Sequence, residues 1–135
     1  MITLFYAGAL TFLGLILAGR IVSIRLSDQV LLGTADNTKL LQATRAQANL
    51  VEYAPFFLIL LGCMEMVGVS VVSLYVLGDL FLLARISHAV GLSKGDGSSI
   101  LRTIGAVSTM LILIVQSVWA MYLASSWMLT NNWGM

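Results

Sequence analysis

The chain has 135 residues, of which 59% are hydrophobic and only 10% are charged, and its net charge is +1. Soluble domains are about half apolar and about a quarter charged, so this composition cannot cover a soluble surface with polar groups. It indicates a membrane protein. No Lys/Arg-rich run is present, which argues against a nucleic acid partner. Cys63 is the only cysteine, so no intrachain disulfide or cysteine metal site can form, and we expect no metal.

Four membrane-spanning helices are the predicted elements, because a span needs about 20 mostly apolar residues. In chain order, they are expected over residues of about 2–24, 41–66, 70–92 and 100–129. A polar stretch separates the first two, Gly68 marks a tight turn, and residues 93–99 read as a loop. The first segment has no charged region before it, so we expect a retained helix and not a signal peptide. The fold class is therefore an all-α membrane bundle, with residues 1–135 as one transmembrane domain.

The placement of basic residues favours four helices over three. A single span from Tyr53 to Gly78 is the alternative. With four helices, however, all seven basic residues fall on one side of the membrane: Arg20, Arg25, Lys39, Arg45, Arg85, Lys94 and Arg102. Cytoplasmic loops are enriched in lysine and arginine. The first and third loops are therefore predicted to be cytoplasmic, with both termini outside.

The second helix carries polar side chains that a span would not hold without a reason. Arg45, Asn49 and Glu52 are spaced i, i+4 and i+7, so they share one helix face over two turns. Gln47 lies on a different face, from which it could reach a neighbouring helix or subunit. A purely structural Arg–Glu pair that fixes packing is the alternative interpretation of this face.

Several arginines are expected to converge at the cytoplasmic interface. His88 follows one of them by three residues on the same helix face, and Glu52 is the one carboxylate within this group. Arginine binds carboxylates and phosphates through paired hydrogen bonds, so an excess of arginine predicts an anionic ligand. The alternative is that arginines at cytoplasmic helix ends only set the topology. The arginines concerned are Arg25, Arg45, Arg85 and Arg102.

The segment from Arg45 to Phe57 contains the pattern Arg-Ala-x-x-Asn-x-x-Glu-x-x-Pro. This pattern resembles the signature of the membrane-associated proteins in eicosanoid and glutathione metabolism, the MAPEG family. A second segment, Ala84–Leu92, and the later segment Arg102–Gly105 resemble the bacterial branch of that family. The resemblance covers essentially the whole chain.

The resemblance implies a homotrimer of four-helix subunits in contact with membrane lipids. It implies glutathione as co-substrate at each subunit interface near the cytoplasmic side, and a small apolar electrophile entering from the bilayer. It also implies a bacterial inner membrane location with both termini periplasmic. Arg102 resembles the arginine that stabilises the glutathione thiolate and is the expected catalytic residue. The residues expected to contact glutathione are Arg25, Arg45, Gln47, Asn49, Glu52, Tyr53, Arg85 and His88.

The implied chemistry is coherent with these side chains. Arginines would hold the two carboxylates of glutathione, and Glu52 would pair with its ammonium group. Because arginine is always protonated, Arg102 would act as an electrostatic stabiliser of the thiolate and not as a base. The leading hypothesis is a membrane glutathione-dependent transferase or peroxidase.

Two other functions stay open at this point. Leukotriene-synthase-like members carry tyrosines where this chain has His88 and Leu92. A non-catalytic member that binds an anionic lipid or partner through the same arginines is therefore one alternative. A small transporter that uses Glu52 as an intramembrane carboxylate is the other.

Overall fold

The computed structural model describes residues 1–93 and 99–131 of the chain. These residues form four helices: α1 (Ile2–Asp28), α2 (Thr38–Met66), α3 (Val71–Ser93) and α4 (Ile100–Thr130). Lys94, most of the predicted third loop and the polar tail from residue 132 lie outside the described residues.

All four helices are long and apolar enough to cross a membrane. The shortest has 23 residues and the longest 31, and a span needs about 20. The protein is therefore an integral membrane protein with an all-α, four-helix fold, which confirms the predicted fold class. The three-helix alternative is wrong, because the chain turns between Met66 and Val71.

Two of the helices are longer than the apolar runs alone predict. α1 continues past Ile24 to Asp28, and α2 begins at Thr38, before the first residue of the predicted span. The side-chain oxygen of Asn37 accepts a hydrogen bond from the Leu40 amide at 3.0 Å, which satisfies a free N–H group at the start of α2. Local capping thus extends helical structure into the polar stretch.

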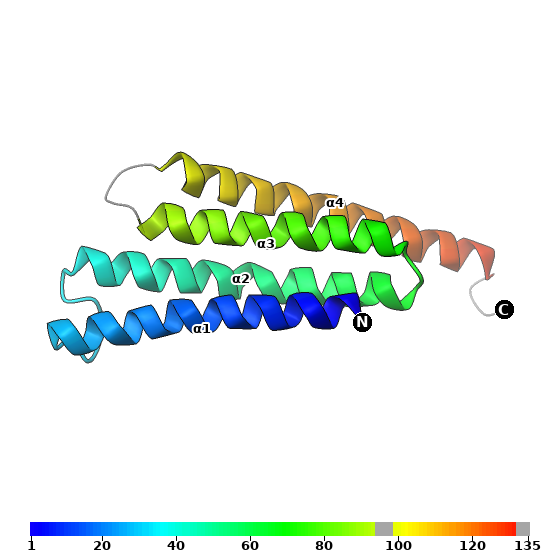
Figure 1. Ribbon diagram of the computed structural model, residues 1–135. Helices are drawn as coiled ribbons and strands as arrows, with labels where there is room; N and C mark the ends of the chain where they lie inside the picture. Colours follow the sequence, from blue (N-terminus) through cyan, green and yellow to red (C-terminus); the bar gives the residue numbers. More distant parts are fainter. Residues whose placement is uncertain (94–98, 132–135) are drawn as a thin grey trace.

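The helices alternate in direction, so the α1–α2 connection and the start of α4 lie at one end of the bundle (Figure 1). We call this the basic end, because every described lysine and arginine lies in the half of its helix nearest to it. The N-terminus, the α2–α3 turn and the end of α4 lie at the opposite end (Figure 1). This separation of charge is the pattern on which the predicted topology depends.

The α2–α3 turn also anchors the start of α1. Gly68 has a φ of 84°, a conformation that favours glycine, and the Val69 amide donates to the Met64 carbonyl at 3.0 Å. Just before the turn, the Glu65 carboxylate accepts hydrogen bonds from the Ile2 and Thr3 amides at 2.7 and 2.9 Å. These amides have no partner inside α1, so Glu65 acts as the cap of that helix from another element.

A buried tyrosine joins α1 to α3. The side chain of Tyr6 is fully buried, and its hydroxyl donates to the Asp79 carboxylate at 2.6 Å and to the Tyr75 carbonyl at 3.1 Å. Asp79 therefore has a structural partner inside the subunit. The Phe57 and Phe81 rings stack at 3.9 Å between α2 and α3 and complete the centre of the core.

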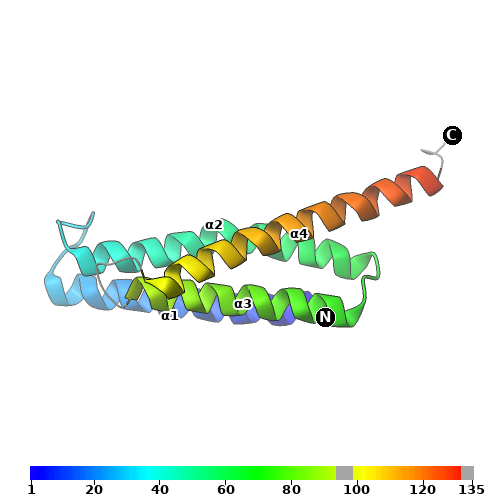
Figure 2. The same cartoon turned by 90° about the horizontal axis from the view of Figure 1, so that it is seen from above.

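The fourth helix leaves the bundle as it runs away from the basic end. α4 packs against α3 along its first turns and then crosses over α2, so that its C-terminal part stands apart from the other helices (Figure 2). Gln116 is the last fully buried polar residue of α4, and its amide nitrogen donates to the Phe57 carbonyl at 3.2 Å. Beyond it, the gap between α4 and α2 widens.

We predict that Gly78→Ala destabilises the protein by about 2 kcal/mol, because overpacking a filled core forces neighbouring groups to move. A Cβ at position 78 would overlap the ring of Tyr6, which is fixed by its own hydrogen bonds. Thermal unfolding in detergent measures the effect. Gly8→Ala is the matched control, because a Cβ there meets nothing within 4 Å. Equal melting temperatures for the two variants would contradict this account of the core.

Candidate functional site

Two glycines let α3 and α4 approach closely at the basic end. A Cβ on Gly91 of α3 would overlap the backbone of Arg102, and a Cβ on Gly105 of α4 would overlap the backbone around Ala84 and His88. Small residues at a helix crossing allow backbones to come together in this way. The crossing therefore places His88 and Arg102 beside each other.

Hydrogen bonds reinforce this crossing. His88 Nδ1 lies 3.2 Å from the Arg102 carbonyl oxygen, and the Ser87 hydroxyl donates to the Leu101 carbonyl at 3.0 Å. Both bonds end on carbonyl oxygens in the first turn of α4. Each of these oxygens accepts the side-chain bond in addition to its bond within the helix. The α3–α4 contact at this end is thus specified by side chains as well as by glycines.

Arg85 connects three helices from inside the bundle. Its side chain is only 2% exposed. One guanidinium nitrogen donates to the side-chain oxygen of Asn49 on α2 at 2.5 Å, and the other donates to the Gly105 carbonyl on α4 at 3.2 Å. The guanidinium also lies 5.7 Å from the centre of the Tyr53 ring and 5.9 Å from that of Phe81. Aromatic faces attract cations, so these rings add to the environment that holds the charge.

A cavity of about 490 Å³ opens between α2, α3 and α4 beside this arginine. It brings together five of the residues that the sequence singled out, and they come from three helices. Arg45, Glu52 and Arg102 are exposed in the single subunit, whereas His88 is buried at the cavity wall. The residues that line the cavity are Leu41, Gln42, Arg45, Ala48, Asn49, Glu52, His88, Leu92 and Arg102.

The predicted face of α2 is present, but it is not an internal salt bridge. Among residues 1–93 and 99–131, no ion pair joins Glu52 to an arginine. Within the single subunit, Arg45 and Glu52 do not form the buried pair of the alternative interpretation, because both side chains are exposed at the cavity. Charged side chains at the edge of a membrane bundle call for a partner from outside the subunit.

The other predicted site residues lie away from the cavity. Arg85 is behind its wall, and Tyr53 packs near the Arg85 guanidinium. Arg25 donates to the Val30 and Leu31 carbonyls at 3.1 and 3.2 Å, so it holds the loop that follows its own helix. Gln47 is half-buried on another face of α2. Within one subunit, the structure does not bring Arg25 and Gln47 to the other predicted residues.

Sequence reasoning missed Gln42, which also lines the cavity. It precedes Arg45 by three residues and Asn49 by seven, so helical spacing alone could have placed it on the same face. Ala48 and Leu41 carry no chemical signal and could be found only from the structure. In the described part of the chain, no group of three or more His, Cys, Asp or Glu side chains is placed to hold a metal ion.

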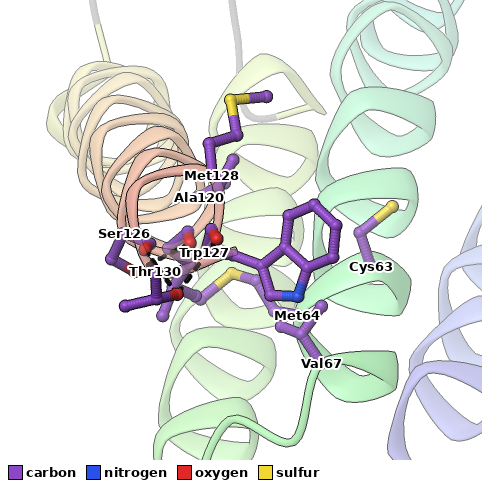
Figure 3. Close-up of a pocket in the computed structure, with 10 residues that line it drawn as sticks. Cys63, Met64, Val67, Ala120, Ser126, Trp127, Met128 and Thr130 are labelled. Carbon is purple, nitrogen blue, oxygen red and sulfur yellow. Dashed lines mark hydrogen bonds between the residues drawn. The ribbon is translucent and has the colours of Figure 1, made fainter. Parts of the chain in front are cut away.

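A second cavity of about 650 Å³ lies at the opposite end, where α4 diverges from α2. Its lining includes Cys63, Met64 and Val67 of α2, and the Trp127 side chain extends from α4 toward them (Figure 3). Among the residues that the structure describes, no charged side chain lines it. Ligand sites combine an apolar pocket with a few convergent polar groups, so the cavity at the basic end is the better candidate.

A model of the MAPEG family matches residues 3–122 of this chain. The chain belongs to the MAPEG family. No protein among those with curated descriptions matches it. The match includes every residue that lines the cavity at the basic end, whereas the residues of the other cavity from Leu123 to Thr130 lie beyond it.

Membership gives this MAPEG protein a general functional class. The family consists of membrane proteins of glutathione-related transferase and peroxidase type. The polar cavity is therefore the place where the structure offers charged groups for such chemistry, at the crossing that Gly91 and Gly105 create.

We predict that Arg85→Lys lowers the stability of this MAPEG protein by about 2 kcal/mol, the scale of a hydrogen bond to a charged group. A lysine ammonium cannot donate along both directions that the Arg85 fork uses, toward Asn49 and toward Gly105. Thermal unfolding in detergent is the measurement. Arg20→Lys is the control, because Arg20 donates to the exposed Ser93 hydroxyl, a bond that a lysine can also make. An unchanged melting temperature for Arg85→Lys would refute the tie between the three helices.

Proposed function

We propose that this protein binds glutathione in the cavity at the basic end and uses it as co-substrate in a transferase or peroxidase reaction. The observation that carries the proposal is the convergence of Arg45, Asn49, Glu52, His88 and Arg102 in one cavity of about 490 Å³. Family membership supports the class of reaction.

The charges of the cavity complement those of glutathione. Glutathione carries two carboxylates and one ammonium group, and the cavity presents two arginines and one glutamate. Arg45 can hold a carboxylate, Arg102 is then left for the sulfur anion, and Glu52 can pair with the ammonium group. Because these side chains have no charged partner among the described residues, a ligand of this kind would satisfy them.

Arg102 is the residue that we propose stabilises the thiolate. The thiolate is the reactive form of glutathione, and a nearby cation favours it over the neutral thiol. Arg85 also carries a positive charge, but it is buried behind the wall with its two terminal nitrogens engaged. Its proposed part is to support the site, and direct contact with the ligand falls to Arg45 and Arg102.

We further propose a homotrimer with glutathione at each subunit interface. The family resemblance implies that Arg25 and Gln47 contact glutathione. Both residues, however, lie on faces of the subunit that do not line the cavity. One glutathione molecule could meet both sets of residues only if two copies pack together. The MAPEG family generally forms trimers, which supports this arrangement.

The proposed orientation places the basic end in the cytoplasm, in a bacterial inner membrane with both termini periplasmic. The described arginines and lysines gather at this end, which supports a cytoplasmic location for it. Glutathione would then enter from the aqueous side. An apolar electrophile would enter from the bilayer, where such molecules concentrate.

One feature of the cavity favours a second candidate function. Leu92 lines the cavity and offers no hydrogen bond where related members have a tyrosine hydroxyl. A protein that holds an anionic phospholipid headgroup without catalysis would use the same arginines. Competition between glutathione and phospholipid distinguishes the two functions.

We predict that glutathione binds the detergent-purified protein saturably and that Arg45→Ala weakens binding at least about tenfold, the scale of one charged hydrogen bond. Titration calorimetry measures both affinities. Arg20→Ala is the matched control, because Arg20 lies at the same end but does not line the cavity. Absence of binding at millimolar glutathione, with tight binding of phospholipid, would favour the second candidate function.

We also predict that Arg102→Ala lowers the rate of glutathione conjugation to a model electrophile by about 100-fold, as loss of a group that stabilises developing charge does. The assay is the initial rate at saturating glutathione, with Arg20→Ala as control. Equal rates for the wild type and Arg102→Ala would remove Arg102 from the proposed mechanism.

A further inference from the structure

The hydrogen bond of His88 fixes which nitrogen of its ring carries the proton. Nδ1 lies 3.2 Å from the Arg102 carbonyl oxygen. A carbonyl oxygen can only accept, so Nδ1 must be the donor, and the neutral ring then carries its lone pair on Nε2. The backbone of α4 thereby holds the imidazole in one tautomer.

The free nitrogen of this ring is open to the cavity. Within residues 1–93 and 99–131, Nε2 has no hydrogen-bond partner. The buried polar side-chain atoms without a partner are Thr3 Oγ1, Arg85 Nε and Gln116 Oε1, and Nε2 is not one of them. An atom that is neither paired nor buried must reach open space, and the open space beside His88 is the cavity that it lines.

Most other polar groups of the cavity donate hydrogen bonds. Arg45 and Arg102 can only donate. The side-chain oxygen of Asn49 is already engaged by Arg85, so Asn49 presents its NH₂ group to a ligand. Among the side chains that line the cavity, Glu52 and His88 carry the basic atoms, whereas Gln42 is a neutral amide.

Glutathione has two kinds of acidic donor to match these two acceptors, an ammonium group and a thiol. Glu52 is a carboxylate on the same helix face as Arg45, which suits the charged amino-acid end of the ligand. His88 is bonded to the backbone of Arg102, and both side chains line the same cavity, where the Arg102 guanidinium is proposed to hold sulfur. The geometry thus pairs a proton acceptor with an anion stabiliser.

We propose that His88 is a catalytic residue that takes the thiol proton of glutathione at Nε2, while Arg102 stabilises the thiolate. The inference rests on the proposed function. In this step the S–H bond breaks, its electron pair stays on sulfur, and a new N–H bond forms at Nε2. The resulting imidazolium keeps its Nδ1 bond to Arg102 and passes the extra proton to water at the basic end.

The surrounding charges make the imidazolium short-lived. His88 faces Arg45 and Glu52 on α2 and Arg102 on α4, and Arg85 lies one turn earlier on α3. The three arginines disfavour the protonated, positively charged ring of His88, and the one carboxylate favours it. His88 therefore acts as a transient acceptor that sets the rate of thiolate formation, whereas Arg102 sets how much thiolate is present at equilibrium.

Stopped-flow ultraviolet absorbance of the thiolate, recorded after mixing with glutathione, tests the proposal. His88→Ala should bind glutathione and form the thiolate about 100-fold more slowly, the usual range for loss of a general base. Added imidazole should restore the rate, and the restored rate should rise with pH as the neutral fraction of imidazole rises. Arg20→Ala is the matched control, because Arg20 lies at the same end outside the cavity, and this variant should form the thiolate at the wild-type rate.

The second variant is His88→Gln, whose side-chain oxygen can accept a hydrogen bond but cannot take up a proton at neutral pH. It should be as slow as His88→Ala, and a wild-type rate of thiolate formation in either variant overturns the proposal. If His88→Ala no longer binds glutathione, the rate of thiolate formation in His88→Gln alone decides the test, and a wild-type rate there overturns the proposal. Failure of the wild type to bind glutathione instead overturns the proposed function, and this inference with it, so the two failures are distinct.

Discussion

The organisation of the basic end depends on one buried positive charge. A guanidinium in a membrane bundle needs partners for its donors, because lipid offers no replacement. The two terminal nitrogens of Arg85 have such partners, the Asn49 side chain on α2 and the Gly105 backbone on α4, whereas its Nε has none among the described residues. The same bonds fix the separation of three helices and the orientation of the Asn49 amide. The wall of the cavity is therefore a consequence of how this charge is paired.

The two cavities follow from the course of α4, which packs closely against α3 at the basic end and diverges from α2 at the opposite end. Gly91 and Gly105 permit the close crossing that sets His88 beside Arg102. Farther along, α4 diverges from α2 and leaves the apolar space beside Trp127 (Figure 3). The bundle thus has a polar, tightly specified end and an apolar, open end. This division agrees with a charged ligand from water and an apolar substrate from the bilayer.

The sequence was sufficient for the features that depend on local spacing. Four apolar runs predicted four helices, and the i, i+4, i+7 spacing placed Arg45, Asn49 and Glu52 on one face, which the structure places at one cavity. Local spacing could not predict which helices pack side by side or which side chains meet between them. The sequence named Arg85 as a residue that contacts glutathione, which stays a prediction, and it gave no sign that the side chain is buried against Asn49 and the aromatic rings.

The partners of two acidic residues also required the structure. Asp79 accepts from Tyr6, which is 73 positions away in the chain, and Glu65 caps α1 from the end of α2. No local pattern links such distant residues. Only the packing of α1 against the other helices brings them together, and each then satisfies polar groups that would otherwise be unpaired at the membrane.

The central claim is that glutathione occupies the cavity at the basic end, and protection of a cysteine placed in its lining tests it most directly. Ala48→Cys adds a thiol there, while the native Cys63 lines the opposite cavity and serves as an internal control. Alkylation of both thiols would be followed by mass spectrometry with and without S-methylglutathione, which has no free thiol. We predict slower labelling at position 48 alone. Equal labelling at position 48 with and without the ligand would contradict the account.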